Sequence, residues 1–339
     1  FRWLESSGIS ICTFLAFISL QWWSFRRSDG GGEFIQRLLA TKDEKQATLA
    51  GIVFLIVNYL IRSWLWILVG LSALVLLPYQ TDWELSYPIL AVTYLPPVGL
   101  GLVVVSMVAA FMSTISTSIN WGASYLAHDL YKRFLRPSAG PREMILIGQL
   151  ASILLLLIGV VTAFYSNSIG SMFRLVIAIG TGPGAVLVLR WFWWRINALT
   201  ELSAMLSGFF VGLITSVSPY FTIEDFGKRL LFTTSFTAVI WLLTLFFTEP
   251  ESEETLNKFV AQVKPPGPGW KKIRKKLNLD SFDSLFVLAS RFIFGSGILY
   301  GGLVSIGAFL LHQEKSGWIA LSIAASCFFL IKKTRLLTQ

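Results

Sequence analysis

The chain contains nine apolar runs that are each long enough to cross a lipid bilayer. A membrane-spanning helix needs about 20 predominantly apolar residues, and such runs occur at 8–25, 48–77, 96–120, 142–165, 169–194, 200–218, 229–248, 283–311 and 316–331. Hydrophobic residues make up 54% of the 339 residues and charged residues only 14%, which is too little polar surface for a soluble protein of this size. The sequence therefore predicts an all-α, polytopic protein embedded in the lipid bilayer.

The basic residues are concentrated on alternate connections between these runs. If the first run crosses from outside to inside, the inside connections and the C-terminal tail hold 21 of the 28 basic residues, and the outside connections hold four. Lys and Arg are enriched on the cytoplasmic side of membrane proteins. The net charge of +9 is therefore explained by membrane orientation and does not point to nucleic acid. We expect a location in the cytoplasmic (plasma) membrane, with the C-terminus in the cytoplasm.

A dense cluster of hydroxyl groups lies in the third apolar run. Its members follow an apolar, glycine-containing stretch, 97–112, and are Ser113, Thr114, Ser116, Thr117 and Ser118. Hydroxyl and carbonyl oxygens are hard ligands for a small cation in a place where water is scarce. For any single hydroxyl, a bond to its own backbone or a packing role is the simpler account. The cluster as a whole predicts a cation site.

Two further features interrupt the expected helices. The stretch Gly180-Thr181-Gly182-Pro183-Gly184 lies in the middle of the fifth run, and it predicts an unwound helix of the kind that lines transport sites. Trp22 and Trp23 lie at the end of the first run. Tryptophans there are typical of the membrane interface, and the alternative is an aromatic gate over a substrate cavity.

Arg62 and Arg174 each lie at a depth in an apolar run where an isolated cation is costly. Arg62 shares a helical face with Asn58, four residues earlier, and Tyr59 adjoins them. These three residues are candidates for a substrate site. Arg174 stands near the start of its run, where a long side chain that reaches the interface is the simpler account.

Residues that usually carry catalysis or bind metals are few and scattered. Cys12 and Cys327 lie near opposite ends of the chain, and His128 and His312 fall between apolar runs. The sequence has no phosphate-binding loop, zinc-binding helix motif, nucleophile elbow or clustered carboxylate pair. We expect no enzyme activity, no cofactor and no disulfide. Because the chain begins with Phe1 and has no signal peptide, we also expect it to be the C-terminal portion of a longer protein.

Three segments of the chain resemble the sodium:solute symporter family, whose members include proline and sugar cotransporters. In chain order they are QWW followed by GGGEFIQRLLATKDEKQA, then AAFMSTISTSINWGASYLAHDLYKRFL, then LRWFWWRINALTE. The resemblance implies a LeuT-type fold, in which two inverted five-helix repeats hold ion and substrate sites between them at mid-membrane. It also implies that residues 1–195 form the second repeat and that the first repeat is absent. Residues 196–339 would then be peripheral helices with a basic cytoplasmic loop at about 249–282.

The resemblance assigns a sodium site to the hydroxyl cluster. Ala110 matches the position whose backbone carbonyl binds the ion, and Ser113 and Thr114 match the two hydroxyl ligands. Ser116 and Thr117 match the region where some members bind a second sodium ion. Sodium is therefore the expected coupling ion.

The resemblance places the solute near the first and second runs. Trp22 and Trp23 occupy the position of the inner gate in sugar-transporting members, and Ser19 lies close to a sugar-contacting position. Tyr59 stands where those members have a substrate-binding lysine. Because Trp and Ser replace the Tyr and Asn of the sugar transporters, the resemblance implies a small organic solute without specifying a sugar.

The function that the resemblance implies is sodium-coupled symport of this solute by alternating access. Sodium would enter down its electrochemical gradient, which supplies about 2.3 kcal/mol per charge for each 100 mV. Coupling requires that the ion and the solute favour the same conformation. The alternative is a membrane sensor or receptor that uses the same fold to report a solute without moving it.

Overall fold

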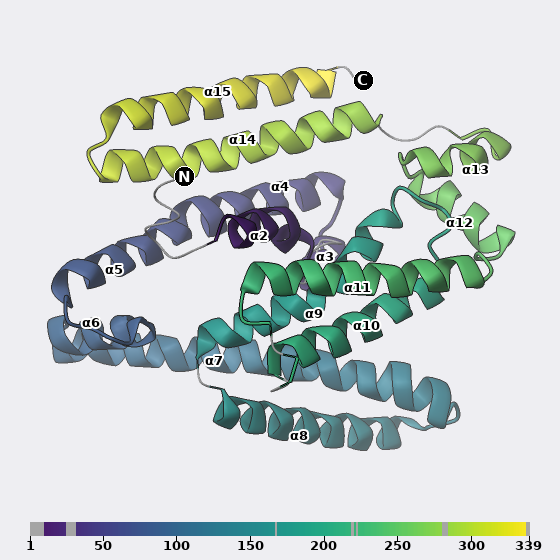
Figure 1. Cartoon of the computed structure of the whole chain (residues 1–339), viewed down its shortest axis with the longest axis horizontal. Helices are drawn as coiled ribbons and strands as arrows, with labels where there is room; N and C mark the ends of the chain where they lie inside the picture. Colours follow the sequence, from purple (N-terminus) through teal and green to yellow (C-terminus); the bar gives the residue numbers. More distant parts are fainter. Residues whose placement is uncertain are drawn as a thin grey trace. The chain divides into compact units, whose positions relative to one another are not determined.

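The computed structural model describes residues 10–24, 32–166, 168–217, 220–221, 223–279 and 284–336. In these ranges every regular element is a helix (Figure 1). Eight helical segments of the described chain are long and apolar enough to cross a membrane: Glu44–Leu76, Pro97–Leu135, Pro141–Tyr165, Ile169–Leu189, Ala198–Val217, Phe226–Phe247, Leu285–Leu310 and Glu314–Lys333. The first predicted run contains the shorter helix α2, Ile11–Ser24. The prediction of an all-α, polytopic membrane protein is confirmed.

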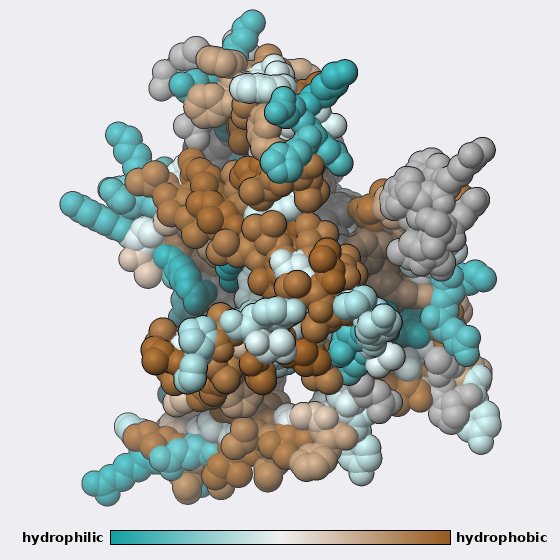
Figure 2. All heavy atoms as spheres, turned by 90° about the vertical axis from the view of Figure 1, so that its left-hand side faces the viewer, coloured by the Kyte–Doolittle hydropathy of each residue, from teal (hydrophilic) through white to brown (hydrophobic). Residues whose placement is uncertain are grey.

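Large apolar side chains are exposed along the spanning helices. Val98, Phe164 and Phe247 are 78%, 86% and 86% exposed. In Figure 2, brown hydrophobic side chains cover much of the face in view, and teal hydrophilic side chains project from its margins. Such a surface would drive aggregation in water, whereas in a bilayer it contacts lipid tails.

The described chain forms two compact units. One consists of residues 68–172, and the other combines the described residues up to 67 with those from 173 onward. The first unit contains the end of α5 (Arg62–Leu76), α6 (Ser86–Tyr94), α7 (Pro97–Ser124), a π-helical continuation of α7 (Tyr125–Leu135) and α8 (Pro141–Tyr165).

Helices α7 and α8 form a hairpin around residues 136–140. Pro97 and Pro141 each lie in the first turn of their helix, where the missing N–H of proline would have no helical partner in any case. At the turn, Glu143 accepts a hydrogen bond from the Tyr131 hydroxyl at 2.6 Å and pairs with Arg136 at 2.9 Å. These contacts close the hairpin at the end that the sequence predicts to be cytoplasmic.

The second unit holds the remaining helices. They are α2, α3 (Gly32–Leu39), α4 (Glu44–Leu55), a π-helical stretch (Ile56–Ile61), the start of α5, most of α9 (Ile169–Leu189), α10 (Ala198–Val217), α11 (Phe226–Phe247), α12 (Glu253–Val263), α13 (Lys271–Lys276), α14 (Leu285–Leu310) and α15 (Glu314–Leu336). One hydrophobic cluster joins α2, α9 and α11, and its buried members are Ala16, Leu20, Ile177, Ala178 and Leu230. At another place the Trp64 indole donates a hydrogen bond to the Leu303 carbonyl at 2.8 Å, which ties α5 to α14.

Helix α9 is continuous through its glycine-rich stretch. The prediction that residues 180–184 unwind is wrong, because α9 runs from Ile169 to Leu189 with Pro183 inside it. The glycines instead allow a close approach of α10: a Cβ atom added at Gly208 would lie 2.8 Å from the Ile179 carbonyl oxygen and 2.8 Å from the Pro183 ring. Pro183 leaves that same carbonyl without its usual N–H partner. Membrane helices tolerate such a residue where a neighbouring helix covers the site.

The predicted basic loop is folded. Residues 249–279, here called the α12–α13 subdomain, have their own hydrophobic cluster, in which Leu256, Val260 and Trp270 are buried. Trp270 also donates its indole N–H to the Arg190 carbonyl at 3.1 Å, and the Gly269 N–H donates to the Phe192 carbonyl at 3.0 Å. The subdomain is therefore fixed to the connection between α9 and α10.

Candidate functional site

The candidate sodium ligands lie along α7. Ala110, Ser113 and Thr114 are exposed and belong to an uninterrupted α-helical segment. Adjacent residues of an α-helix point about 100° apart, so the Ser113 and Thr114 side chains point in different directions on the same side of the helix. The Thr114 hydroxyl donates a hydrogen bond to the Ala110 carbonyl at 3.0 Å. Two of the three candidate oxygens are therefore neighbours on one face.

Two oxygens at this separation can share one cation. Hard cations such as Ca²⁺ lie about 2.4 Å from oxygen ligands, and at that distance the Ala110 and Thr114 oxygens would subtend roughly 77° at the ion. The hydroxyl hydrogen now lies between the two oxygens, so an ion that bridges them requires this hydrogen to turn away. A threonine hydroxyl rotates freely enough to do so, at the loss of a bond worth about 0.5–1.5 kcal/mol.

The Ser113 hydroxyl has no hydrogen-bond partner in the described part of the chain, whereas its backbone carbonyl accepts a bond from the Thr117 hydroxyl at 2.9 Å. One turn further, Asn120 donates from its amide to the Ser116 hydroxyl at 3.5 Å. Back-bonding of Thr114 and Thr117 is the local behaviour that the simpler account of the hydroxyl cluster predicted. It leaves lone pairs on both threonine oxygens free.

The first group of candidate solute residues lies on α2. Ser19 is exposed and its hydroxyl donates to the Leu15 carbonyl at 2.6 Å. Trp23 packs against the cluster that joins α2, α9 and α11, and a Cβ atom at Gly184 would lie 2.2 Å from the Trp23 carbonyl. The end of α2 is thus held directly against the glycine-rich part of α9. The side chain of Trp22 lies outside the described residues.

The second group lies on an irregular stretch of helix. Asn58 and Tyr59 belong to the π-helical turn Ile56–Ile61, and Arg62 follows it, with its N–H bonded to the Val57 carbonyl five residues back. Single π-turns inside α-helices are frequent at functional sites. The sequence contained no signal for this turn, because the run is apolar and has no proline or glycine there. Tyr59 also packs edge-on against Phe54, with ring centroids 6.1 Å apart.

The two sets of candidates belong to different units. The sodium candidates fall within residues 68–172, and the solute candidates fall within the unit that contains residues up to 67. Arg174, the second arginine candidate from the sequence, is exposed on the second turn of α9, and its charge repels that of Arg229. A second cation beside it makes Arg174 a poorer candidate for a structural ion pair.

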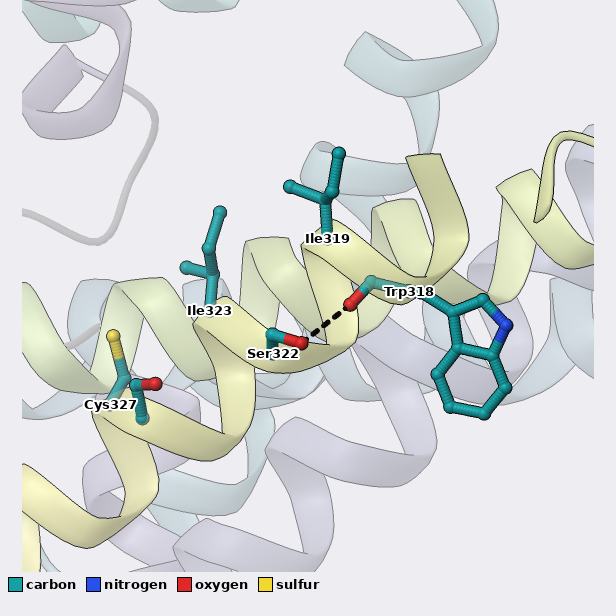
Figure 3. Close-up of a pocket in the computed structure, with 6 residues that line it drawn as sticks. Trp318, Ile319, Ser322, Ile323 and Cys327 are labelled. Atoms are coloured by element: carbon teal, nitrogen blue, oxygen red, sulfur yellow. Dashed lines mark hydrogen bonds between the residues drawn. The ribbon is translucent and has the colours of Figure 1, made fainter. Parts of the chain in front are cut away.

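The groove along α15 offers few polar groups for binding an ion or a polar solute. An open apolar groove runs along α15 and is lined by Trp318, Ile319, Ser322, Ile323, Ser326 and Cys327 (Figure 3). Its polar side-chain groups are two serine hydroxyls, one indole N–H and one thiol, and the Ser322 hydroxyl donates a hydrogen bond to the Trp318 carbonyl at 2.8 Å. Within the described residues, no cluster of three or more His, Cys, Asp or Glu side chains could hold a metal ion.

Comparison with known proteins identifies the family. The sequence profile of the sodium:solute symporter family matches residues 28–208, which is more than half of the chain. The sodium/glucose cotransporter of Vibrio parahaemolyticus is 26% identical over 258 residues, which cover 70% of this chain and 46% of that protein. The high-affinity proline transporter PutP of Bacillus subtilis is 32% identical over 114 residues, covering 33% of this chain and 24% of that protein.

A human relative, sodium/myo-inositol cotransporter 2, is 25% identical over 196 residues, which cover 51% of this chain and 29% of that protein. No solved structure matches the chain significantly. The chain thus spans less than half the length of these relatives. With its apolar helices, the family match shows an integral membrane protein, and the chain belongs to the sodium:solute symporter family.

Proposed function

We propose that this chain takes part in sodium-coupled secondary active transport of a small organic solute across the cytoplasmic membrane. The family match and the names of the relatives support this proposal. Those names include glucose, proline and myo-inositol, which share little beyond being small and polar. The solute is therefore proposed only as a small organic molecule. The relatives named above are transporters, and they give no support to a sensor function.

The observation that carries the proposal is the set of oxygens on α7. The 3.0 Å separation of the Ala110 and Thr114 oxygens suits joint coordination of one hard cation, and the Ser113 hydroxyl has no competing bond within the described residues. We assign the primary sodium site to these three residues. Ser116 and Thr117 are proposed as ligands of a second ion.

Three protein oxygens do not satisfy a hard cation, which takes six or more ligands when it resembles Ca²⁺. The exposed face of α7 supports a site that is completed by further oxygens from another element or from water. A site shared between elements would respond to their relative movement. This is the property that couples ion binding to a conformational change.

The proposed solute site consists of two groups of residues in the second unit, one on α2 and one at the π-helical turn before α5. Ser19, Trp22 and Trp23 would lie at the gate, and Asn58, Tyr59 and Arg62 would supply an amide, a phenol and a cation to the solute. The π-turn that presents the second group supports this assignment. Tyr59 and Arg62 are exposed, so both are accessible to a ligand.

The proposed organisation follows the family. Residues 1–195 would form the second five-helix repeat of a LeuT-type core, and residues 196–339 would form peripheral helices. The excess of basic residues on alternate connections supports a cytoplasmic C-terminus.

The test is sodium-driven uptake by the full-length protein in liposomes. Radiolabelled sugars, amino acids and carboxylates are offered under an inward sodium gradient, and one class is expected to accumulate with sodium but not with potassium. Loss of one charge-assisted contact costs about 1.5–3 kcal/mol, so Ser113→Ala and Thr114→Ala should each raise the half-saturating sodium concentration roughly ten- to hundredfold. Ser118→Ala is the matched control and should stay close to wild type. A protein that binds a solute but never accumulates it under any ion gradient would contradict the proposal.

A further inference from the structure

The α12–α13 subdomain separates its charges. Its basic residues include four exposed lysines on α13, which has the sequence KKIRKK: Lys271, Lys272, Lys275 and Lys276. Its acidic residues gather before and at the start of α12 and are Glu249, Glu251, Glu253 and Glu254. The two groups differ in what they contact, and this difference indicates what the lysines are available for.

Two of the four acidic side chains form contacts that stabilise the fold. Glu251 accepts a hydrogen bond from the Ala198 N–H at 3.0 Å, at the start of α10. Glu253 pairs with Lys276 at 2.7 Å. Glu253 and Glu254 also lie in the first turn of α12, where negative charge stabilises the helix dipole. Within the described residues, neither Glu249 nor Glu254 forms an ion pair with a lysine of α13.

The two central residues of α13 also form contacts within the subdomain. Ile273 packs against the buried cluster of Leu256, Val260 and Trp270. Arg274 donates hydrogen bonds to the backbone carbonyls of Pro265 and Gly267. Anchoring these two central residues turns the remaining lysines outward.

Three lysines therefore form a free cationic face. Lys271, Lys272 and Lys275 are exposed, and none of them forms an ion pair with a residue that the structure describes. Each carries a compact charge on a flexible four-carbon stem. We call these three residues the lysine face.

The lysine face begins next to the C-terminal end of the membrane-spanning helix α9. Trp270, the residue before Lys271, donates its indole N–H to the carbonyl of Arg190, and Arg190 directly follows the end of α9 at Leu189. A six-residue helix is about 9 Å long, which is close to the Debye length of about 8–10 Å at physiological salt. The whole of α13 thus lies within electrostatic reach of a membrane surface at the end of α9. The connection that it contacts also contains Trp191, Trp193 and Trp194, a residue type enriched at that surface.

We propose that the lysine face binds the anionic headgroups of the lipid leaflet next to it. Clusters of Lys and Arg immediately beside a membrane helix are attracted to phosphate-bearing anionic lipids, by about 5-fold in affinity for each lysine. Binding would hold the α12–α13 subdomain against the leaflet. Because that subdomain is bonded to the α9–α10 connection, lipid composition would act directly on the ends of both helices.

The geometry favours a lipid surface over an acidic protein or free phosphate. Three lysines on one convex helical turn make no concave site for a single small anion, whereas their stems can each reach a separate headgroup. The fixed height of Trp270 at the end of α9 keeps the face beside the leaflet. An acidic partner protein would not require that height.

The test measures lipid preference in the purified protein. The protein in neutral detergent is titrated with phosphatidylglycerol or phosphatidylcholine that carries an acceptor fluorophore, and binding is followed by energy transfer from tryptophan. We expect tighter binding of phosphatidylglycerol, weakening as salt is raised from about 0.1 M to about 1 M. Lys271→Gln/Lys275→Gln should lower this preference on the order of 25-fold, and Lys271→Arg/Lys275→Arg should retain it.

The matched control is Lys228→Gln/Lys315→Gln, which removes the same charge at exposed positions in the first turns of α11 and α15, at the ends that the sequence predicts to lie outside. It should keep the wild-type preference, and all variants should elute as one species in size-exclusion chromatography. Equal binding of the two lipids by the wild type would overturn the proposal. So would an unchanged preference in the glutamine variant, or full competition by inorganic phosphate at millimolar concentration.

Discussion

The hydroxyl of Thr13 on α2 donates a hydrogen bond at 2.8 Å to Asp225, which caps α11. Ser10 donates to the other carboxylate oxygen at 3.2 Å, and the Lys228 N–H donates to Asp225 at 2.9 Å. One carboxylate therefore caps α11 and joins it to a helix 212 residues away in sequence. The Lys228 N–H, aided by the two hydroxyls, holds the pKa of Asp225 below its usual value, although partial burial opposes the shift.

This contact predicts a loss of stability in acid. A carboxyl group whose pKa is lowered by folding contributes stability above its unfolded pKa of about 3.9, and this contribution disappears as the pH falls through the folded value. Asp225→Ala should lower stability at neutral pH by about 0.5–2 kcal/mol, while Asp225→Asn, which still caps, should cost less. Thermal unfolding in detergent measures both effects. The gap between wild type and the alanine variant should narrow below about pH 4, and a gap that stays constant at all pH values would exclude the ionised cap.

The contact between α9 and α10 predicts a strong effect of one methyl group. Gly208→Ala should destabilise the protein by about 1–3 kcal/mol, because the new Cβ atom would meet the Ile179 carbonyl and the Pro183 ring and force the helices apart. Gly159→Ala on α8 is the control, since nothing lies within 4 Å of its Cβ position. The control should be neutral or slightly stabilising, because alanine favours a helix over glycine by about 1 kcal/mol. Equal unfolding temperatures for the two variants would contradict this account of the glycines.

The same helices show which parts of the fold the sequence could predict. Apolar length predicted the spanning helices well, because hydrocarbon thickness sets that length directly. The sequence Gly-Thr-Gly-Pro-Gly was misleading, since the same residues that unwind an isolated helix also permit close packing against a neighbour. The presence of Gly208 and Gly212 on the partner helix decides between the two outcomes, and a pattern read along one segment does not contain that information.

For the candidate site, the sequence shows which residues are unusual but not how they are hydrogen-bonded. The hydroxyl cluster on α7 is visible in the sequence because polar residues are rare in an apolar run. The bond between Thr114 and the Ala110 carbonyl depends on a rotamer choice, and the π-turn at Ile56–Ile61 depends on a change of hydrogen-bond register. Neither feature can be recognised from the residue types in the sequence. The α12–α13 subdomain was missed for another reason: its cluster of Leu256, Val260 and Trp270 is too small to stand out from a basic background.

The basic connections predict the orientation of the chain. After replacement of the native cysteines, a cysteine at Ser138 or Lys272 should be shielded from an impermeant thiol reagent in intact cells, and one at Thr81 or Ser316 should be labelled. All four positions are exposed, so protection reports the membrane side and not burial. Gly267 would be a poor choice in the same loop, because a side chain there meets the Phe192 backbone. The reverse labelling pattern would invert the proposed direction of the sodium path.

The π-turn predicts that solute and ion affinities can be separated. Arg62 follows the turn, is exposed, and supplies a cation that a membrane-embedded site must pair with a ligand or another group. In full-length protein, Arg62→Gln should therefore raise the half-saturating solute concentration roughly tenfold or more, the loss expected for one charge-assisted hydrogen bond, and should leave the half-saturating sodium concentration nearly unchanged.

Two further variants test whether the effect of Arg62→Gln is specific to the charge and to this position. Arg62→Lys keeps the charge but loses the planar fork of donors, so it should restore part of the solute affinity if the site recognises a negative charge. Arg174→Gln removes an exposed arginine near the start of α9 and should leave solute affinity close to wild type. Uptake is measured at fixed sodium with varied solute, and then at fixed solute with varied sodium. Because Ala110, Ser113 and Thr114 hold the proposed ion, equal shifts of both constants in Arg62→Gln would show that Arg62 acts on the conformation common to both ligands and not on the solute.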